Sequence, residues 1–196
     1  MLFDIIVSLI KKRGRPLEHY FTNNENLKSE VRTLRYEYGN VSFAFLSDNG
    51  VFAKNKIDYG SAFLIETFMK NKKSTVRTLL DVGCGYGFMG IVLSKLLNIH
   101  VDMVDINKRA VHLTERNIKE NKVNANCFES NIYSNVAESY DVIISNPPIR
   151  AGKKVVLEIL NDSKKFLTED GELWFVMRKD QGVKSINKEL EKSFQI

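Results

Sequence analysis

The sequence predicts an α/β fold in which a mostly parallel, doubly wound sheet carries helices on both faces. Short apolar runs alternate with helical patterns through residues 76–196, which is typical of parallel strands joined by helical crossovers. The run at 77–82 is followed by the glycine-rich turn Gly83–Gly87, and the run at 100–105 ends in an acid, Asp105. A glycine-rich strand-to-helix turn followed one strand later by an acid indicates nucleotide binding in such a sheet.

The elements of this sheet follow from the same patterns. Strands are expected at 77–82, 100–105, 125–130, 140–146 and 171–179, and helices at 88–97, 107–121, 153–167 and 183–193. Asn107 is a residue type that caps helix N-termini, and Gly171 stands just before the last expected strand.

The amino-terminal part of the chain has a different pattern. Two runs of alternating β-forming residues, Val31–Tyr38 and Val41–Ser47, flank Gly39-Asn40, and this spacing predicts a β-hairpin. A helix is expected from about Ala62 to Lys70, with Ser61 as its N-cap. A small N-terminal hairpin and one helix therefore precede the main sheet.

The composition is that of an ordinary globular chain with a basic surplus. Of the net charge of +5, residues 1–75 carry a surplus of four and residues 76–196 a surplus of one. Such clustering suits a nucleic-acid partner, and a solvated basic face explains it equally well. Two cysteines indicate no disulfide framework, which favours a reduced, cytoplasmic setting. No apolar stretch is long enough to span a membrane, and no metal-ligand spacing is present.

A third motif closes the run at 140–146, which ends in Asn146-Pro147-Pro148-Ile149. The order of Asp81 with the glycine turn, then Asp105, then Asn-Pro-Pro resembles the class I S-adenosylmethionine-dependent methyltransferases that act on planar amines. A glycine turn that binds nothing and a turn-forming acid at Asp105 are the structural alternatives.

A narrower resemblance rests on four segments, Gly50–Ala53, Ile57–Ser61, Asp81–Gly87 and Ser145–Lys153. They resemble the bacterial small-subunit (16S) ribosomal RNA guanine-N2 methyltransferases and their single-domain relatives. The similarity runs from about His19 to Phe194. It implies a Rossmann-like fold, S-adenosyl-L-methionine as cofactor, methyl transfer to guanine N2, and ribosomal RNA or the small ribosomal subunit as partner.

Three parts are expected along the chain. Residues 1–18 form a leader, helical or disordered; residues 19–75 hold the hairpin and helix that cap the cofactor site; residues 76–196 form the core that binds the cofactor. The C-terminal hairpin that completes the sheet in the family is expected to be missing here. The strand at 171–179 then becomes a sheet edge that is apolar on both faces, so we expect self-association or lowered stability.

The resemblance implies a set of cofactor-binding residues. They are Asp81, Gly83, Cys84, Gly85, Gly87, Asp105, Ile106, Asn131, Ile132 and Asn146. Asp105 would accept from both ribose hydroxyls, Ile106 would lie against the adenine, and Asp81 would bind the amino group of the methionine part. Asn131 and Ile132 stand where the family often has an acid that faces the adenine amine.

The resemblance also implies that Asn146, Pro147, Pro148 and Ile149 form the catalytic clamp. Prolines stiffen the loop and hold the residue before them extended, so the Asn146 side chain and the Pro147 carbonyl can face the cofactor methyl. These two acceptors would hold the hydrogens of a guanine amine, and positioning would supply most of the rate. A base in a duplex would have to flip out first. Ile149 replaces an aromatic residue of many relatives, which fits the guanine subset.

The substrate-binding residues expected are Phe52, Asp58, Arg150 and Lys153. Phe52 and Asp58, with Tyr59, would form a lid over the cofactor or base, with core packing the alternative for Phe52. Arg150 and Lys153 would hold phosphate or face solvent at a helix start. Alternative functions are methylation of adenine N6 or of a protein glutamine, and a non-catalytic cofactor- or RNA-binding module.

Overall fold

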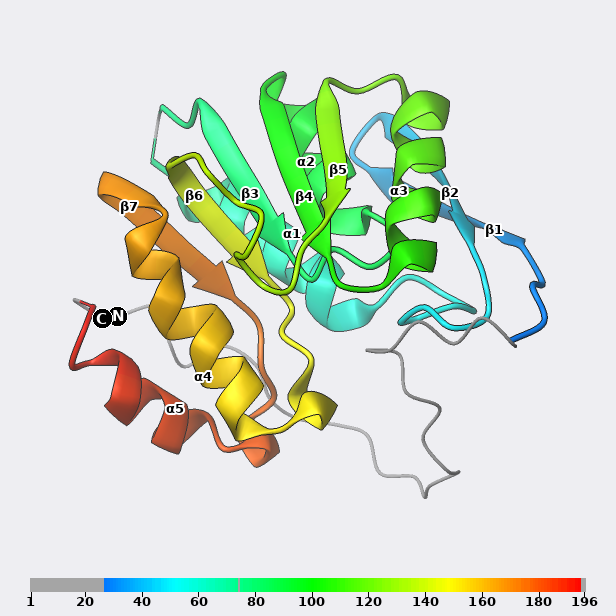
Figure 1. Ribbon diagram of the computed structural model, residues 1–196. Helices are drawn as coiled ribbons and strands as arrows, with labels where there is room; N and C mark the ends of the chain where they lie inside the picture. Colours follow the sequence, from blue (N-terminus) through cyan, green and yellow to red (C-terminus); the bar gives the residue numbers. More distant parts are fainter. Residues whose placement is uncertain (1–26, 74, 195–196) are drawn as a thin grey trace.

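The centre of the molecule is a five-stranded sheet with the order β5-β4-β3-β6-β7, in which every neighbouring pair is parallel (Figure 1). The strands are β3 (Thr78–Val82), β4 (His100–Asp105), β5 (Ala125–Glu129), β6 (Tyr140–Ser145) and β7 (Leu167–Phe175). The computed structural model describes residues 27–73 and 75–194, so the expected leader at 1–18 lies outside the described residues. The sheet confirms the predicted Rossmann-like fold class.

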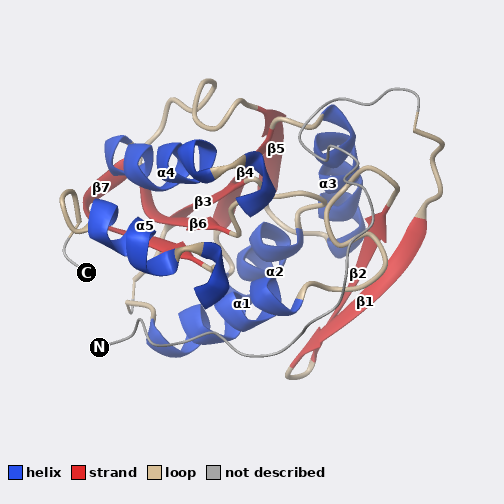
Figure 2. Cartoon of the chain, turned by 90° about the horizontal axis from the view of Figure 1, so that it is seen from below, coloured by secondary structure: helices blue, strands red, loops and turns tan. Residues whose placement is uncertain are grey.

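Helices cover both faces of this sheet, as Figure 2 shows from below. One face carries α1 (Tyr59–Asn71), α2 (Phe88–Leu97) and α3 (Lys108–Asn121), and the other carries α4 (Lys153–Asp162) and α5 (Val183–Leu190). Successive side chains of a strand point to opposite faces. In β3, accordingly, Leu79 belongs to the apolar cluster under α1 to α3, and Leu80 to the cluster under α4 and α5.

The predicted N-terminal hairpin is also confirmed. Strands β1 (Arg32–Tyr38) and β2 (Val41–Ser47) pair antiparallel and form a small sheet of their own. The hairpin lies beside α2 and α3 at one end of the main sheet (Figure 1). Its inner face is aromatic: the Phe45 ring meets the Phe88 ring of α2 edge-on, with centroids 5.4 Å apart.

The start of α1 corrects the sequence prediction. The helix begins at Tyr59, not near residue 62, and its N-cap is Asp58 rather than Ser61. The Asp58 carboxylate accepts a hydrogen bond from the Ser61 backbone N–H at 2.8 Å. Both residues are of types that cap helices well, so sequence alone did not separate them. At the start of α3, by contrast, the expected cap Asn107 is confirmed.

The last strand also differs from its expected bounds. We predicted a start at 171 and an end at 179, and β7 runs over Leu167–Phe175. It pairs with β6 at Leu167 and again from Glu172, so the turn-like residues between them bulge out. Gly171, expected at the beginning of the strand, therefore lies in its middle.

Two helices end earlier than the periodicity predicted. Helix α4 ends at Asp162 instead of 167, because Ser163–Lys165 tighten into a 3₁₀ turn. Helix α5 ends at Leu190 instead of 193. Helix ends often tighten in this way. None of the helices within the described residues is long and apolar enough to cross a membrane.

Within the described sheet, β7 is an edge strand, as expected. Both of its faces are covered. The Trp174 ring meets the Phe68 ring of α1 edge-on at 5.2 Å between centroids, and Leu173 and Phe175 pack into the cluster under α4 and α5. Among the described residues, no strand pairs with the outer edge of β7, and the expected self-association through that edge stays a prediction.

Candidate active site

The predicted site residues meet at the carboxyl ends of neighbouring strands. Asp81 lies in β3, Asp105 ends β4, and Asn146 follows β6. The chain leaves β3 toward α2 on one face and β6 toward α4 on the other, so the strand order reverses between them. Open α/β sheets bind ligands at such a reversal. The Ser145 hydroxyl donates to the Val82 carbonyl at 2.8 Å and ties the two strand ends together.

The glycine turn after β3 combines open space with close packing. Gly83, Gly85 and Gly87 have φ angles of 73°, 60° and 85°, which glycine adopts without strain. A Cβ on Gly83 or Gly85 would meet nothing within 4 Å, whereas a Cβ on Gly87 would lie 2.6 Å from Thr114 Cγ2. Gly83 and Gly85 therefore leave room for a ligand, and Gly87 lets α3 approach the turn.

Cys84 is a packing group inside this turn. Its Sγ lies 3.9 Å from the Sγ of Cys127 on β5, and both thiols are free. The hydrogen bond to Cys127 and burial both raise the pKa of the Cys84 thiol, so it is protonated at neutral pH.

Asp105 holds the glycine turn against the end of β4. Its Oδ2 accepts from the Gly85 backbone N–H at 2.8 Å, and its Oδ1 accepts from the Asn107 N–H at 2.9 Å. Burial raises the pKa of Asp105 to about 6, against the opposing effect of its backbone hydrogen bonds. Each carboxylate oxygen has a further lone pair, so Asp105 can also accept from a ribose. Ile106, which is 39% exposed, offers an apolar surface beside it.

Asp81 carries an unpaired acceptor beneath the same turn. Its side chain is fully buried, and Oδ2 accepts from the Gly90 N–H in the first turn of α2 at 2.9 Å. Oδ1 has no hydrogen-bond partner among the described residues. Burial, more than the nearby Asp105 charge, raises the pKa of Asp81 to about 7. A buried acceptor without a partner is costly, so this atom is suited to receive a bound donor such as an ammonium group.

Asn146 is held by α1, from a distant part of the sequence. Its Nδ2 donates to Asp58 Oδ2 at 3.1 Å and to Ser61 Oγ at 2.9 Å. A carboxylate can only accept, which sets the orientation of the amide. Nδ2 thereby faces two acceptors, and Oδ1 remains as an acceptor for a ligand.

The residues after Asn146 form a stiff turn. Pro147 is buried, and the Pro148 carbonyl accepts from the Ala151 N–H at 2.9 Å in the 3₁₀ turn that follows. Ile149 is half-buried against the apolar cluster under α4 and α5. The clamp is therefore anchored in the core, and only its first residue carries a polar side chain.

The predicted lid residues take different positions. Phe52 is 52% exposed, so it is not a core residue. Its loop stays near Ile106 because the Asn107 Nδ2 donates to the Gly50 carbonyl at 2.9 Å. Tyr59, 76% exposed, opens α1 directly after Asp58.

Arg150 and Lys153, the two residues predicted to hold phosphate, also differ in their surroundings. Arg150 is exposed in the turn after the prolines. Lys153, also exposed, donates from Nζ to Ser185 Oγ of α5 at 2.6 Å. Lys154 is exposed at the same helix start.

Asn131 and Ile132 lie beside the end of β4. The preceding residue, Ser130, donates its N–H to the Asp105 carbonyl at 3.0 Å. Asn131 is exposed and Ile132 is half-buried with a φ of 54°. Their turn thus forms the β5 side of the site.

Two asparagines that the sequence analysis missed join the hairpin to the site. Asn117 Oδ1 accepts from the Leu46 N–H at 2.7 Å, and its Nδ2 donates to the carbonyls of Leu46 and Tyr86 at 2.9 and 2.8 Å. One turn later, Asn121 bonds the Ala44 backbone in the same way. These side chains replace a neighbouring strand for β2. Two asparagines four apart on the apolar face of a predicted helix were the available signal.

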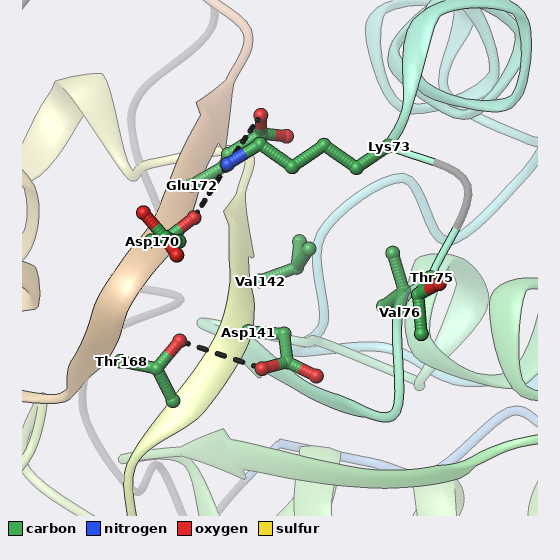
Figure 3. A pocket seen from close by; sticks show the side chains of 8 residues that line it. All are labelled: Lys73, Thr75, Val76, Asp141, Val142, Thr168, Asp170 and Glu172. Atoms are coloured by element: carbon green, nitrogen blue, oxygen red, sulfur yellow. Dashed lines mark hydrogen bonds and ion pairs between the residues drawn. The ribbon is translucent and has the colours of Figure 1, made fainter.

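A pocket of about 380 Å³ lies at the opposite end of the sheet and is not part of this site. Figure 3 shows its lining residues, Lys73, Thr75, Val76, Asp141, Val142, Thr168, Asp170 and Glu172. Lys73 Nζ donates to the Asp170 carbonyl at 2.6 Å and lies 3.4 Å from Glu172 Oε1. These contacts tie the connection after α1 to the bulge in β7.

The chain is similar to known proteins over most of its length. Residues 42–196 match the family model described as methyltransferase small domain. The protein YbxB of Bacillus subtilis strain 168, described as uncharacterized, is 41% identical over 181 residues, which cover 90% of this chain and 89% of that protein.

Two further matches are longer proteins. The ribosomal RNA small subunit methyltransferase C of Aliivibrio fischeri is 34% identical over 157 residues, which cover 77% of this chain and 45% of that one. The structure of a T. thermophilus 16S rRNA N2 methyltransferase in complex with AdoMet and guanosine superposes with a TM-score of 0.76 at 23% identity, over 86% of this chain and 47% of that one. The chain thus spans about half the length of these ribosomal RNA methyltransferases.

Proposed function

Because the chain belongs to the methyltransferase small domain family, we propose that it transfers a methyl group from S-adenosylmethionine to an exocyclic amine, N2 of a guanine in small-subunit ribosomal RNA. Family membership confirms the resemblance drawn from the sequence, and S-adenosylmethionine is the cofactor of this family. The observation that carries the proposal is the orientation of the Asn146 amide, with Nδ2 turned toward Asp58 and Ser61.

Four features of the chain fit the cofactor. The open space beside Gly83 and Gly85 can take the methionine part, and the unpaired Asp81 Oδ1 can accept from its ammonium group. Asp105 keeps lone pairs for the ribose hydroxyls, and Ile106 gives an apolar surface for the adenine. When bound, the cofactor supplies an electrophilic methyl group on a sulfonium.

The Asn146 side chain selects the kind of atom that is methylated. Since its Nδ2 faces Asp58 and Ser61, it offers Oδ1 to a substrate. An acceptor favours a substrate group that donates N–H, and it leaves a ring nitrogen or carbonyl oxygen unpaired, which is disfavoured in a partly buried site. The site therefore prefers an amine.

Two acceptors together suit a guanine amine. Its lone pair is delocalised into the ring, so the amine is a weak nucleophile. Asn146 Oδ1 and the Pro147 carbonyl can each accept one N–H, which directs the nitrogen lone pair toward the methyl carbon. Positioning and fixed dipoles then do most of the catalysis, and no strong base is required before attack.

Ribosomal RNA as the substrate rests on charge and on the relatives. Arg150 and Lys154 are exposed next to the clamp, where they can contact phosphates. Phe52 and Tyr59 expose aromatic surface on the α1 side, where bases can stack. The longer relatives include proteins described as small-subunit ribosomal RNA methyltransferases.

The test is methyl transfer from cofactor labelled on its methyl group. The substrates are unmodified small-subunit ribosomal RNA and assembled small subunits, and the RNA is digested to nucleosides. The proposal expects label in N2-methylguanosine, and at least about a hundredfold less with Asn146→Ala. Label in N6-methyladenosine or in protein glutamine would move the proposal to those substrates. Cofactor binding without transfer to RNA or protein would indicate a non-catalytic binding module.

A further inference from the structure

We propose that Asp58 and Ser61 are positioning residues that lock the Asn146 amide with Oδ1 toward the reacting amine. The inference rests on the proposed function. It assigns to the first turn of α1 a part in methyl transfer that is separate from binding the cofactor or covering the substrate.

Asp58 Oδ2 is the common acceptor of this hydrogen-bond network. Asp58 Oδ2 accepts from the Ser61 N–H at 2.8 Å, from Ser61 Oγ at 3.1 Å and from Asn146 Nδ2 at 3.1 Å. The Ser61 hydroxyl in turn accepts from Asn146 Nδ2 at 2.9 Å. The three side chains therefore form a closed ring of hydrogen bonds, and the Asn146 Nδ2 faces two acceptors in it.

This ring resists rotation of the amide. A half-turn about the last side-chain bond of Asn146 would place Oδ1 against Asp58 Oδ2, so that two acceptors would face each other in a partly buried site. Nδ2 would then point at the substrate with hydrogens that repel an amine. The carboxylate makes that orientation unfavourable.

The packing of α1 keeps the ring in place. Ser61 is buried, and the Gly60 backbone passes so close that a Cβ there would lie 3.1 Å from Asp58 Oδ2 and 3.5 Å from Val176 Cγ2. Val176 follows β7, and its N–H donates to the Ser145 carbonyl at 3.2 Å. The start of α1 therefore packs closely against the ends of β6 and β7, next to Asn146.

Asp58 also caps α1, so an alanine variant would lose both the helix cap and the hydrogen bond to Asn146, and the two effects could not be separated. Serine caps helices as well as aspartate does, but its side chain is one atom shorter and does not reach Asn146. Asparagine caps equally well, and its single oxygen can replace Asp58 Oδ2 for all three donors. Asp58→Ser and Asp58→Asn are thus a matched pair, with the cap preserved in both.

Asp58→Ser and Asp58→Asn are expected to differ in kcat. With ribosomal RNA as substrate, Asp58→Ser should lower kcat about tenfold to a hundredfold, and Ser61→Ala about threefold to tenfold, with cofactor affinity within about twofold of the wild type. Asp58→Asn should rescue kcat to within about threefold of the wild type. Melting temperatures of the full chain check that the cap is intact.

A second readout does not depend on activity. In nitrogen-15 NMR spectra, the two Asn146 side-chain amide protons should exchange slowly with water in the wild type. One of them should exchange at least about tenfold faster in Asp58→Ser and in Ser61→Ala. The resonances are assigned by their absence in Asn146→Asp.

Two results would overturn the inference. Asp58→Asn as impaired as Asp58→Ser would mean that the negative charge, and not the acceptor geometry, is required. Unchanged Asn146 amide exchange in Asp58→Ser and Ser61→Ala would mean that the ring does not hold the amide. If the wild type methylates neither RNA nor subunits, the proposed function fails, while the exchange data still decide the positioning.

Discussion

Replacing Gly87 by alanine should destabilise the fold, whereas the same change at Gly83 should mainly remove cofactor binding. Both residues have left-handed backbones, with φ angles of 85° and 73°, so the backbone cost of alanine is similar, about 1–2 kcal/mol. The surroundings differ. A Cβ on Gly87 would lie 2.6 Å from Thr114 Cγ2 and 3.0 Å from Ile91 Cδ1, and a Cβ on Gly83 would meet nothing within 4 Å.

The collision at Gly87 sets the size of the effect. Overpacking in a well-packed core costs about 1–3 kcal/mol, which brings Gly87→Ala to about 2–5 kcal/mol in the free energy of unfolding. Gly83→Ala should cost only about 1–2 kcal/mol. In a chain of this size, each kcal/mol corresponds to roughly 2–4 °C in melting temperature.

The assay combines urea unfolding with calorimetric titration by S-adenosylmethionine. Gly83→Ala should stay folded and bind the cofactor at least about tenfold more weakly, because its Cβ fills the ligand's space. Thr114→Ser removes the colliding methyl and keeps the hydroxyl that donates to the Gly85 carbonyl at 2.9 Å. In that background Gly87→Ala should cost at least about 1 kcal/mol less. Equal destabilisation by the two alanines, or additive effects in the double variant, would refute the reasoning.

Three further predictions follow from the same structure. Burial raises the pKa of Asp81 to about 7 from about 4 in the unfolded chain, so the folded state holds the extra proton and wild-type stability falls as pH rises across that window. The free energy of unfolding of Asp81→Asn should therefore exceed that of the wild type by at most about 4 kcal/mol above pH 7 and should equal it below pH 4, while cofactor affinity drops. A difference in urea unfolding that stays constant across pH contradicts this. Asn117→Ala leaves the Leu46 and Tyr86 backbone groups unpaired and should cost about 2–4 kcal/mol in the free energy of unfolding, with faster hydrogen exchange at the Leu46 amide. Unchanged exchange argues against the hydrogen bonds from Asn117 to β2. The open edge of β7 should cause concentration-dependent association in sedimentation velocity, and a persistent monomer that melts cooperatively would remove that expectation.

The sequence was sufficient for the parts of the molecule that local patterns encode. Short apolar runs predicted the strands, and their alternation with segments of helical period predicted a parallel sheet. The glycine turn and Asp105 followed from backbone conformations that only certain residues adopt. The bounds of β7 were wrong because the bulge before Glu172 has the composition of a turn, and pairing with β6 overrode it.

The tertiary structure decided which polar groups meet. Asn146 lies 88 residues from Asp58 and 85 from Ser61 along the chain, and Asn117 lies 71 residues from Leu46. No periodicity carries such information, because the partner of a polar side chain depends on how whole elements pack. The unpaired Asp81 oxygen is likewise a property of its surroundings. The sequence by itself determined the sheet, the turn and the motif residues, and only the packing of α1 and the hairpin determined how those residues are oriented, since hydrogen bonds require groups within about 3 Å of one another.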